Sequence, residues 1–134
     1  MEKFLDVIEE FNDNQKEYLA LRVMGFEWKF VMMLIGLSQN AISYWKGSQR
    51  FLEVESLLVA NKKEFLPQVQ DYFNDKMAAI DYSLLKLASK IVDWDNVEKI
   101  DKPYIMKAVE MVKKRFGVEE GRKKKDGWLL EEAK

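Results

Sequence analysis

The chain has 134 residues, of which 48% are hydrophobic and 34% are charged, and its formal net charge is −1. This length and composition allow one modest hydrophobic core and one further helical module. The sequence has no cysteine and no histidine, which excludes disulfides and thiol nucleophiles and removes the commonest metal ligand and general base. Because it also has no glycine-rich phosphate loop, we expect a binding protein, not an enzyme, with no cofactor and no metal.

Residues 1–60 are predicted to form an N-terminal helical unit. Apolar residues at helical spacing predict a short acidic helix over the first dozen residues. Residues 12–14 offer an N-cap for a second helix, which Gly25 ends. A third helix is expected over 27–35 and a fourth over 39–46. After Gly47, Ser48 is expected to cap one more helix.

The stretch 27–46 has the pattern of two short helices joined by a tight turn. Gly36 tolerates a positive φ, Leu37 would lie under the turn, and Ser38 is a suitable N-cap. In the helix expected over 39–46, Ile42 and Trp45 lie on the apolar side. We interpret this stretch as a helix-turn-helix of the homeodomain-like kind, and therefore as a DNA-binding element.

The other side of this helix is polar. Gln and Asn side chains can bond adenine edges bidentately in the major groove of double-stranded DNA, and the cations that follow the helix would reach phosphate. Basic residues outnumber acidic ones in the motif region and in 102–117, which is compatible with weak DNA binding by one copy. The predicted DNA-binding residues are Ser38, Gln39, Asn40, Ser43, Tyr44, Lys46 and Arg50.

A plainer interpretation of the same stretch is a small helical core. In that case Ile35, Leu37, Ile42 and Trp45 would serve only for packing. Met32, which stands where the motif usually has a small alanine, favours this alternative.

Residues 67–117 are predicted to form a helical hairpin, after a boundary at 61–66. Pro67 fits the first turn of a new helix. Apolar residues then step by three and four over 68–92, which predicts one helix of about seven turns. A polar loop over 93–100 follows, and the last helix has Asp101 as its cap, Pro103 in its first turn and Gly117 at its end.

Such a hairpin leaves an apolar side exposed unless it meets another subunit. We therefore expect a closed homo-oligomer. The residues predicted to form the subunit interface are Tyr72, Phe73, Met77, Ile80, Leu84, Leu87 and Ile91.

Two further segments have a functional and a plain interpretation. Three carboxylates lie close together in the sequence, at Asp93, Asp95 and Glu98. They lack the spacing of a calcium-binding loop, so we expect a solvated loop. Residues 118–134 are expected to form a flexible, solvated tail. In the alternative, the tail docks on a partner protein through Trp128, Leu129 and Leu130.

From Gln15 to Leu58 the chain resembles the small subunit of a tailed-phage terminase. The resemblance rests on a helix that ends near a glycine, the segment GLSQNAISYW, and the Phe-Leu-Glu-Val-Glu helix that follows. It implies a homo-oligomeric ring that recognises the viral packaging site and presents DNA to a large subunit with ATPase and nuclease activities. It assigns DNA reading to the polar face of the 39–46 helix and phosphate contacts to Lys46 and Arg50.

Two other classes of protein would use the same motif. One is a transcriptional regulator or transposition-associated DNA-binding protein, and the other is an assembly protein with a degenerate helix-turn-helix. The acidic N-terminus MEKFLDVIEEF and the short apolar runs are unlike a signal peptide or a membrane span. We expect a cytoplasmic protein without membrane contact, in the host cell cytoplasm if it is viral.

Overall fold

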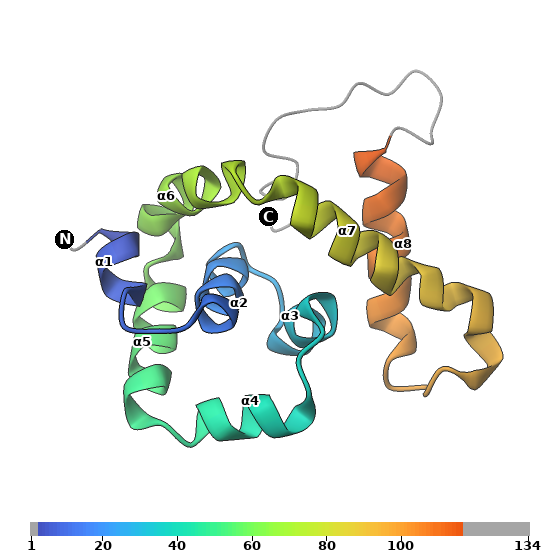
Figure 1. The fold of residues 1–134 in the computed structure, drawn as a ribbon, viewed down its shortest axis with the longest axis horizontal. Coiled ribbons are helices and arrows are strands. Elements are labelled where there is room, and N and C mark those ends of the chain that lie inside the picture. Colours follow the sequence, from blue (N-terminus) through green and yellow to red (C-terminus); the bar gives the residue numbers. More distant parts are fainter. Residues whose placement is uncertain (1–2, 117–134) are drawn as a thin grey trace.

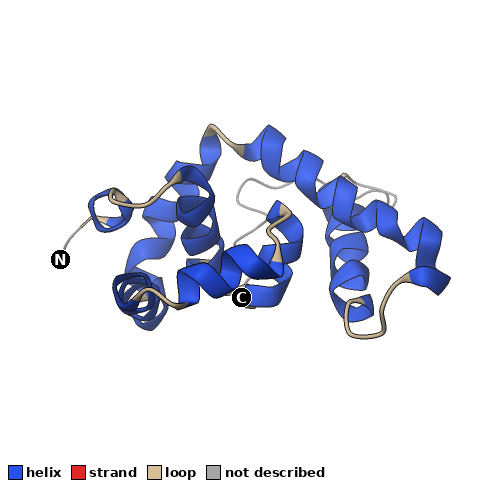
Figure 2. Cartoon of the chain, turned by 60° about the horizontal axis from the view of Figure 1, so that its bottom comes forward, coloured by secondary structure: helices blue, strands red, loops and turns tan. Residues whose placement is uncertain are grey.

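A computed structural model describes residues 3–116, and in this part of the chain the regular secondary structure is all helical, with no strand (Figures 1 and 2). The all-α prediction is thus confirmed for the described residues. In chain order the elements are α1 (Phe4–Ile8), α2 (Asp13–Val23), α3 (Trp28–Ile35), α4 (Gln39–Lys46), α5 (Gln49–Ala60), α6 (Lys62–Asn74), α7 (Met77–Ala88), the 3₁₀ segment η1 (Ser89–Asn96) and α8 (Lys102–Arg115).

Helix α2 lies at the centre of the N-terminal helices and contacts α3, α5 and α6 (Figure 1). It begins with a capping box, in which the Asn12 side chain accepts from the Gln15 amide and the Gln15 side chain accepts from the Asn12 amide. Tyr18, Leu19 and Leu21 are fully buried. Because so much of its surface is covered, α2 fixes the positions of the helices around it.

The turn between α3 and α4 has the predicted features. Gly36 adopts the left-handed conformation with φ 75°, which a residue with a side chain rarely adopts. The Leu37 amide donates to the Met32 carbonyl at 2.9 Å, and the Ser38 hydroxyl accepts from the Ala41 amide at 3.1 Å. The bounds 39–46 predicted for the second of these helices are those of α4.

The prediction of one long helix over 68–92 is wrong. Helix α6 already begins at Lys62 and holds Pro67 in its interior. The helix is interrupted at Asp75 and Lys76, before α7 begins. Helix α6 packs on α1, α2 and α5. The spacing of three and four persists across the break because Phe73 and Ile80 both point into the core, so the apolar pattern does not reveal the change of direction.

The predicted hairpin pairs a 68–92 helix with the last helix; in the structure the shorter α7 packs on α8, and α7 also packs on α3 (Figure 1). The buried residues of α8 are Ile105, Ala108 and Met111. The connection is shorter than the predicted 93–100 loop because η1 continues to Asn96. Asp101 makes no side-chain cap; its carboxylate lies 3.7 Å from the Lys29 ammonium of α3.

Candidate nucleic-acid interface

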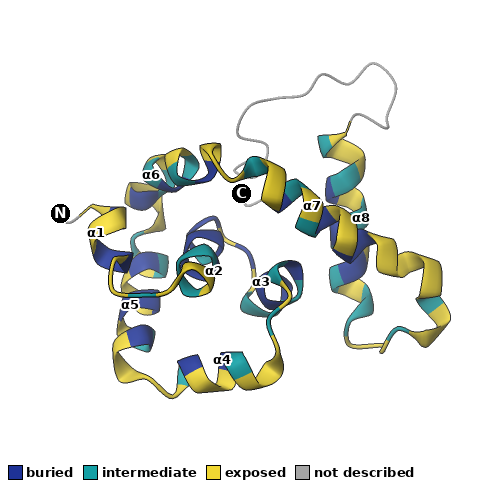
Figure 3. Cartoon of the chain, viewed as in Figure 1, coloured by how far each residue is buried: buried dark blue, intermediate teal, exposed yellow. Residues whose placement is uncertain are grey.

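Helix α4 has one buried and one exposed face. Ile42 and Trp45 are buried, whereas the polar residues lie on the outward side of the helix (Figure 3). Within the described part of the chain, the side chains on this outward side make no hydrogen bond or ion pair, and Tyr44 is 77% exposed. The Ser38 hydroxyl is already used as the cap acceptor. The exposed set is Gln39, Asn40, Ser43 and Tyr44.

Three aromatic rings hold the buried face of α4. The Trp45 ring lies 5.8 Å from the Tyr18 ring of α2 and 5.6 Å from the Phe51 ring of α5, measured between centroids. Tyr18 and Phe51 are themselves 5.7 Å apart. Aromatic contacts of this kind contribute about 0.5–1.5 kcal/mol each beyond the burial of area. They define the orientation in which α4 presents its polar face.

A buried carboxylate, Glu55 of α5, joins the same helices. It is 6% exposed. Its Oε2 accepts from the Tyr18 hydroxyl at 2.6 Å and from Arg22 Nε at 3.0 Å, and its Oε1 accepts from Lys46 Nζ at 2.7 Å. Burial by itself would raise the pKa of Glu55, but the hydrogen bonds from Lys46, Tyr18 and Arg22 outweigh it and lower the pKa.

Sequence reasoning did not assign a role to Glu55, although the signal was present. Phe51, Glu55 and Leu58 are separated by four and three residues and therefore share one face of a helix. A carboxylate between two fully buried apolar residues needs partners in the core. The same network raises the pKa of Tyr18 well above its usual range, first through burial and then through the hydrogen bond to Glu55.

Both cations predicted to contact phosphate have carboxylate partners within the chain. The Lys46 side chain is 33% exposed, and besides bonding Glu55 it lies 5.7 Å above the Tyr18 ring and 5.9 Å above the Trp28 ring. Arg50 Nε bonds Glu10 Oε1 at 2.7 Å, but its side chain remains 60% exposed. The exposed face of α4 therefore carries no unpaired charge.

The residues predicted to form a subunit interface are mostly internal. Phe73, Ile80, Leu84 and Leu87 are buried within the single chain. The expectation that this apolar side stays exposed unless it meets another subunit is thus wrong for the buried residues of α7, because α3 and α8 of the same chain cover that helix. Among the remaining predicted interface residues, Tyr72 and Met77 are half-buried and Ile91 is exposed.

Three other expectations concern a membrane, a metal and the tail. The helices of the described part are too short or too polar to cross a membrane. In the same part, no three acidic side chains gather where they could hold a metal ion, and Asp93 instead accepts a hydrogen bond from the Asn96 amide group. Residues Trp128, Leu129 and Leu130, predicted to dock on a partner, lie outside the described residues.

Comparison of this chain with protein-family models, with curated proteins and with solved structures finds no match.

Proposed function

We propose that the protein binds double-stranded DNA through the exposed face of α4, as the DNA-recognising small subunit of a viral terminase that presents packaging DNA to a large subunit. The observation that carries this proposal is the free polar face of α4. Gln39 and Asn40 stand in its first turn with no side-chain partner among the described residues. Their amide groups suit adenine edges in a major groove.

The electrostatics support weak binding by each copy. Releasing Arg50 from Glu10 costs little, since exposed ion pairs contribute about 0–1 kcal/mol. Lys46 is a poorer phosphate ligand because its withdrawal would leave the buried Glu55 with one cation fewer. Arg50 is therefore the phosphate contact that the proposal retains, and useful affinity requires several copies that bind together.

Assembly, which the proposal requires, fits the outward face of α7 and the start of η1. Exposed residues recur there at alternating steps of four and three: Ala78, Tyr82, Leu85, Ser89 and Val92. Tyr82 is 68% exposed and Val92 is 90% exposed. Steps of four and three are the spacing at which two helices pack side by side. We therefore assign the oligomer contact to this outward face.

Fluorescence anisotropy with labelled DNA duplexes of different sequence tests the DNA proposal. Asn40→Ala should flatten the preference among sequences, and Arg50→Ala should weaken binding to all of them and reduce the salt slope by about 1. Lys62→Ala is the matched control, because it removes another exposed cation, at the start of α6 and away from α4 (Figure 1). If all three variants bind like the parent, α4 does not read DNA.

The paired state of Lys46 and Arg50 favours one competing class, an assembly protein without DNA binding. Native mass spectrometry with and without a DNA duplex separates the classes. A ring that binds DNA supports the terminase proposal, and a DNA-binding dimer supports a transcriptional regulator. A ring that leaves DNA free supports the assembly protein.

A further inference from the structure

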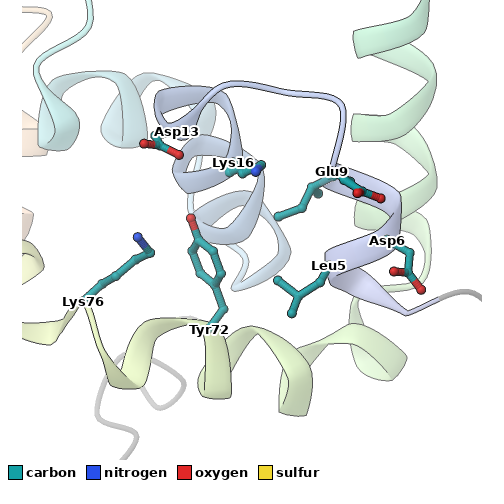
Figure 4. A pocket seen from close by; sticks show the side chains of 8 residues that line it. Leu5, Asp6, Glu9, Asp13, Lys16, Tyr72 and Lys76 are labelled. Carbon is teal, nitrogen blue, oxygen red and sulfur yellow. The ribbon is translucent and has the colours of Figure 1, made fainter.

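A cleft of about 400 Å³ lies between α1, the start of α2, and the end of α6 with the turn that follows it (Figure 4). Its walls are fixed to each other: the Phe4 amide of α1 donates to Gln68 Oε1 of α6 at 2.7 Å, and the Phe4 and Tyr72 rings are 5.9 Å apart. The cleft is lined by Leu5, Asp6, Ile8, Glu9, Asp13, Lys16, Tyr72 and Lys76.

This cleft combines apolar surface with an excess of negative charge. Leu5 is 62% exposed, and the Tyr72 ring stands between Leu5 and Lys76 (Figure 4). Asp6, Glu9 and Asp13 have no hydrogen-bond or ion-pair partner among the described residues. Lys76 covers the Tyr72 ring at 5.2 Å from its centroid. Lys16 also lines the cleft, so three carboxylates face two ammonium groups and one negative charge is left without a balancing cation.

The chain carries a segment of complementary chemistry in residues 122–130. It has four consecutive cations, Arg122, Lys123, Lys124 and Lys125, followed by the apolar group Trp128, Leu129 and Leu130. The cations match the carboxylates of the cleft, and the apolar group matches Leu5 and the Tyr72 ring.

The position at which α8 ends brings this segment within reach of the cleft. Arg115 bonds Asp81 of α7 through two nitrogens, each at 3.3 Å. Asp81 is five residues after Lys76, which corresponds to about 7 Å along a helix. The six residues 116–121 can span up to about 20 Å when extended. Arg122 can therefore reach the edge of the cleft at Lys76, and the residues that follow it can extend along the cleft.

We infer that the cleft between α1, α2 and α6 binds the chain's own segment 122–130, with the basic run on the carboxylates of α1 and α2 and Trp128 beside Leu5 and Tyr72. In this docked form Trp128, Leu129 and Leu130 are covered, so a protein partner that recognises them has to displace the segment from the cleft. The inference does not depend on DNA binding by α4.

Paramagnetic labelling of the full chain tests the inference, because the absence of native cysteine lets a single introduced Gly127→Cys carry a nitroxide. In dilute protein, the amide signals of Leu5, Glu9 and Lys76 should broaden, whereas those of Asn40 and Val92 should not. The triple change Lys123→Glu, Lys124→Glu and Lys125→Glu should abolish this broadening. The matched triple change to arginine keeps the charge and should preserve the broadening.

A charge exchange makes the test specific for the cleft. In the chain with the parent tail, the double change Asp6→Lys with Glu9→Lys should abolish the broadening of the cleft signals. In the chain whose three tail lysines are changed to glutamate, the same double change should restore it. Both cleft residues are exposed, so the exchange leaves the core intact. The inference is overturned if the broadening is absent or uniform, if the glutamate tail retains it, or if it disappears on dilution, which would place the segment on a second copy.

Discussion

The Lys46 ammonium donates a 2.7 Å hydrogen bond to Glu55 Oε1 and so joins the last turn of α4 to the middle of α5. Tyr18 and Arg22 of α2 bond the other oxygen of the same carboxylate. One buried charge thus connects three helices, and it fixes the end of the helix whose outer face is proposed to read DNA. The network links the stability of the fold to the geometry of the candidate interface.

Glu55→Gln should lower the free energy of unfolding by about 2 kcal/mol. The change keeps the size of the side chain but leaves Lys46 and Arg22 without their counter-charge. Removing one partner of a fully buried pair costs about 3–5 kcal/mol, and the partial exposure of both cations reduces this value. Urea denaturation measures the change. Glu10→Gln, which breaks only the exposed pair with Arg50, is the control and should cost less than about 1 kcal/mol.

The same carboxylate should make the protein less stable in acid. Its pKa is lower in the folded chain than in the unfolded chain, so the unfolded state binds more protons. The stabilisation is complete above the unfolded pKa and is lost as the pH falls through the folded pKa. A denaturation series from neutral to acidic pH should show this loss, and Glu55→Gln should remove that part of the slope. An unchanged slope in the variant would assign the acid sensitivity to other groups.

Glu17 should have the opposite effect on how the stability of the protein depends on pH. Burial raises its pKa most, Asp13 raises it further, and Lys76 lowers it. Because the folded state then holds its proton more tightly, the stability that Glu17 contributes is complete below the unfolded pKa and is lost as the pH rises through the folded pKa. Glu17→Gln should therefore stabilise the protein at neutral pH and lose this advantage in acid. Thermal unfolding at both pH values measures the effect, and a variant that is less stable than the parent at neutral pH would contradict it.

The features that the sequence predicted most reliably are those that neighbouring residues in the chain determine, such as helix bounds, caps and turns. The bounds of α4, the Ser38 cap and the positive φ of Gly36 follow from local backbone chemistry, and the structure has all three. The partners of Lys46 and Arg50 could not be read in this way, because Glu55 and Glu10 reach them through the tertiary fold. The break at Lys76 was also hidden, since the apolar spacing continues across it.

The two faces of α7 illustrate a further limit of apolar spacing. Leu84 and Leu85 are adjacent, and each continues a series with helical period. Spacing alone does not say which series points into the core when both contain large apolar residues. The structure buries Leu84 completely and leaves Leu85 44% exposed. Most of the predicted interface residues thus lie on the internal face, and the outward face of α7 was overlooked.

This difference gives a matched test of assembly by two adjacent substitutions. Leu84→Asp places an unpaired charge in the core and should unfold the chain, since such changes belong to the most destabilising class of substitutions. Leu85→Asp should keep the helical circular dichroism and the unfolding midpoint of the monomer, because aspartate remains hydrated at this exposed position. If the outward face of α7 forms the oligomer contact, Leu85→Asp should also reduce the native mass to that of a smaller species. A folded Leu85→Asp variant with the mass of an oligomeric parent would place the contact elsewhere, and a monomeric parent would remove the basis for multivalent DNA binding.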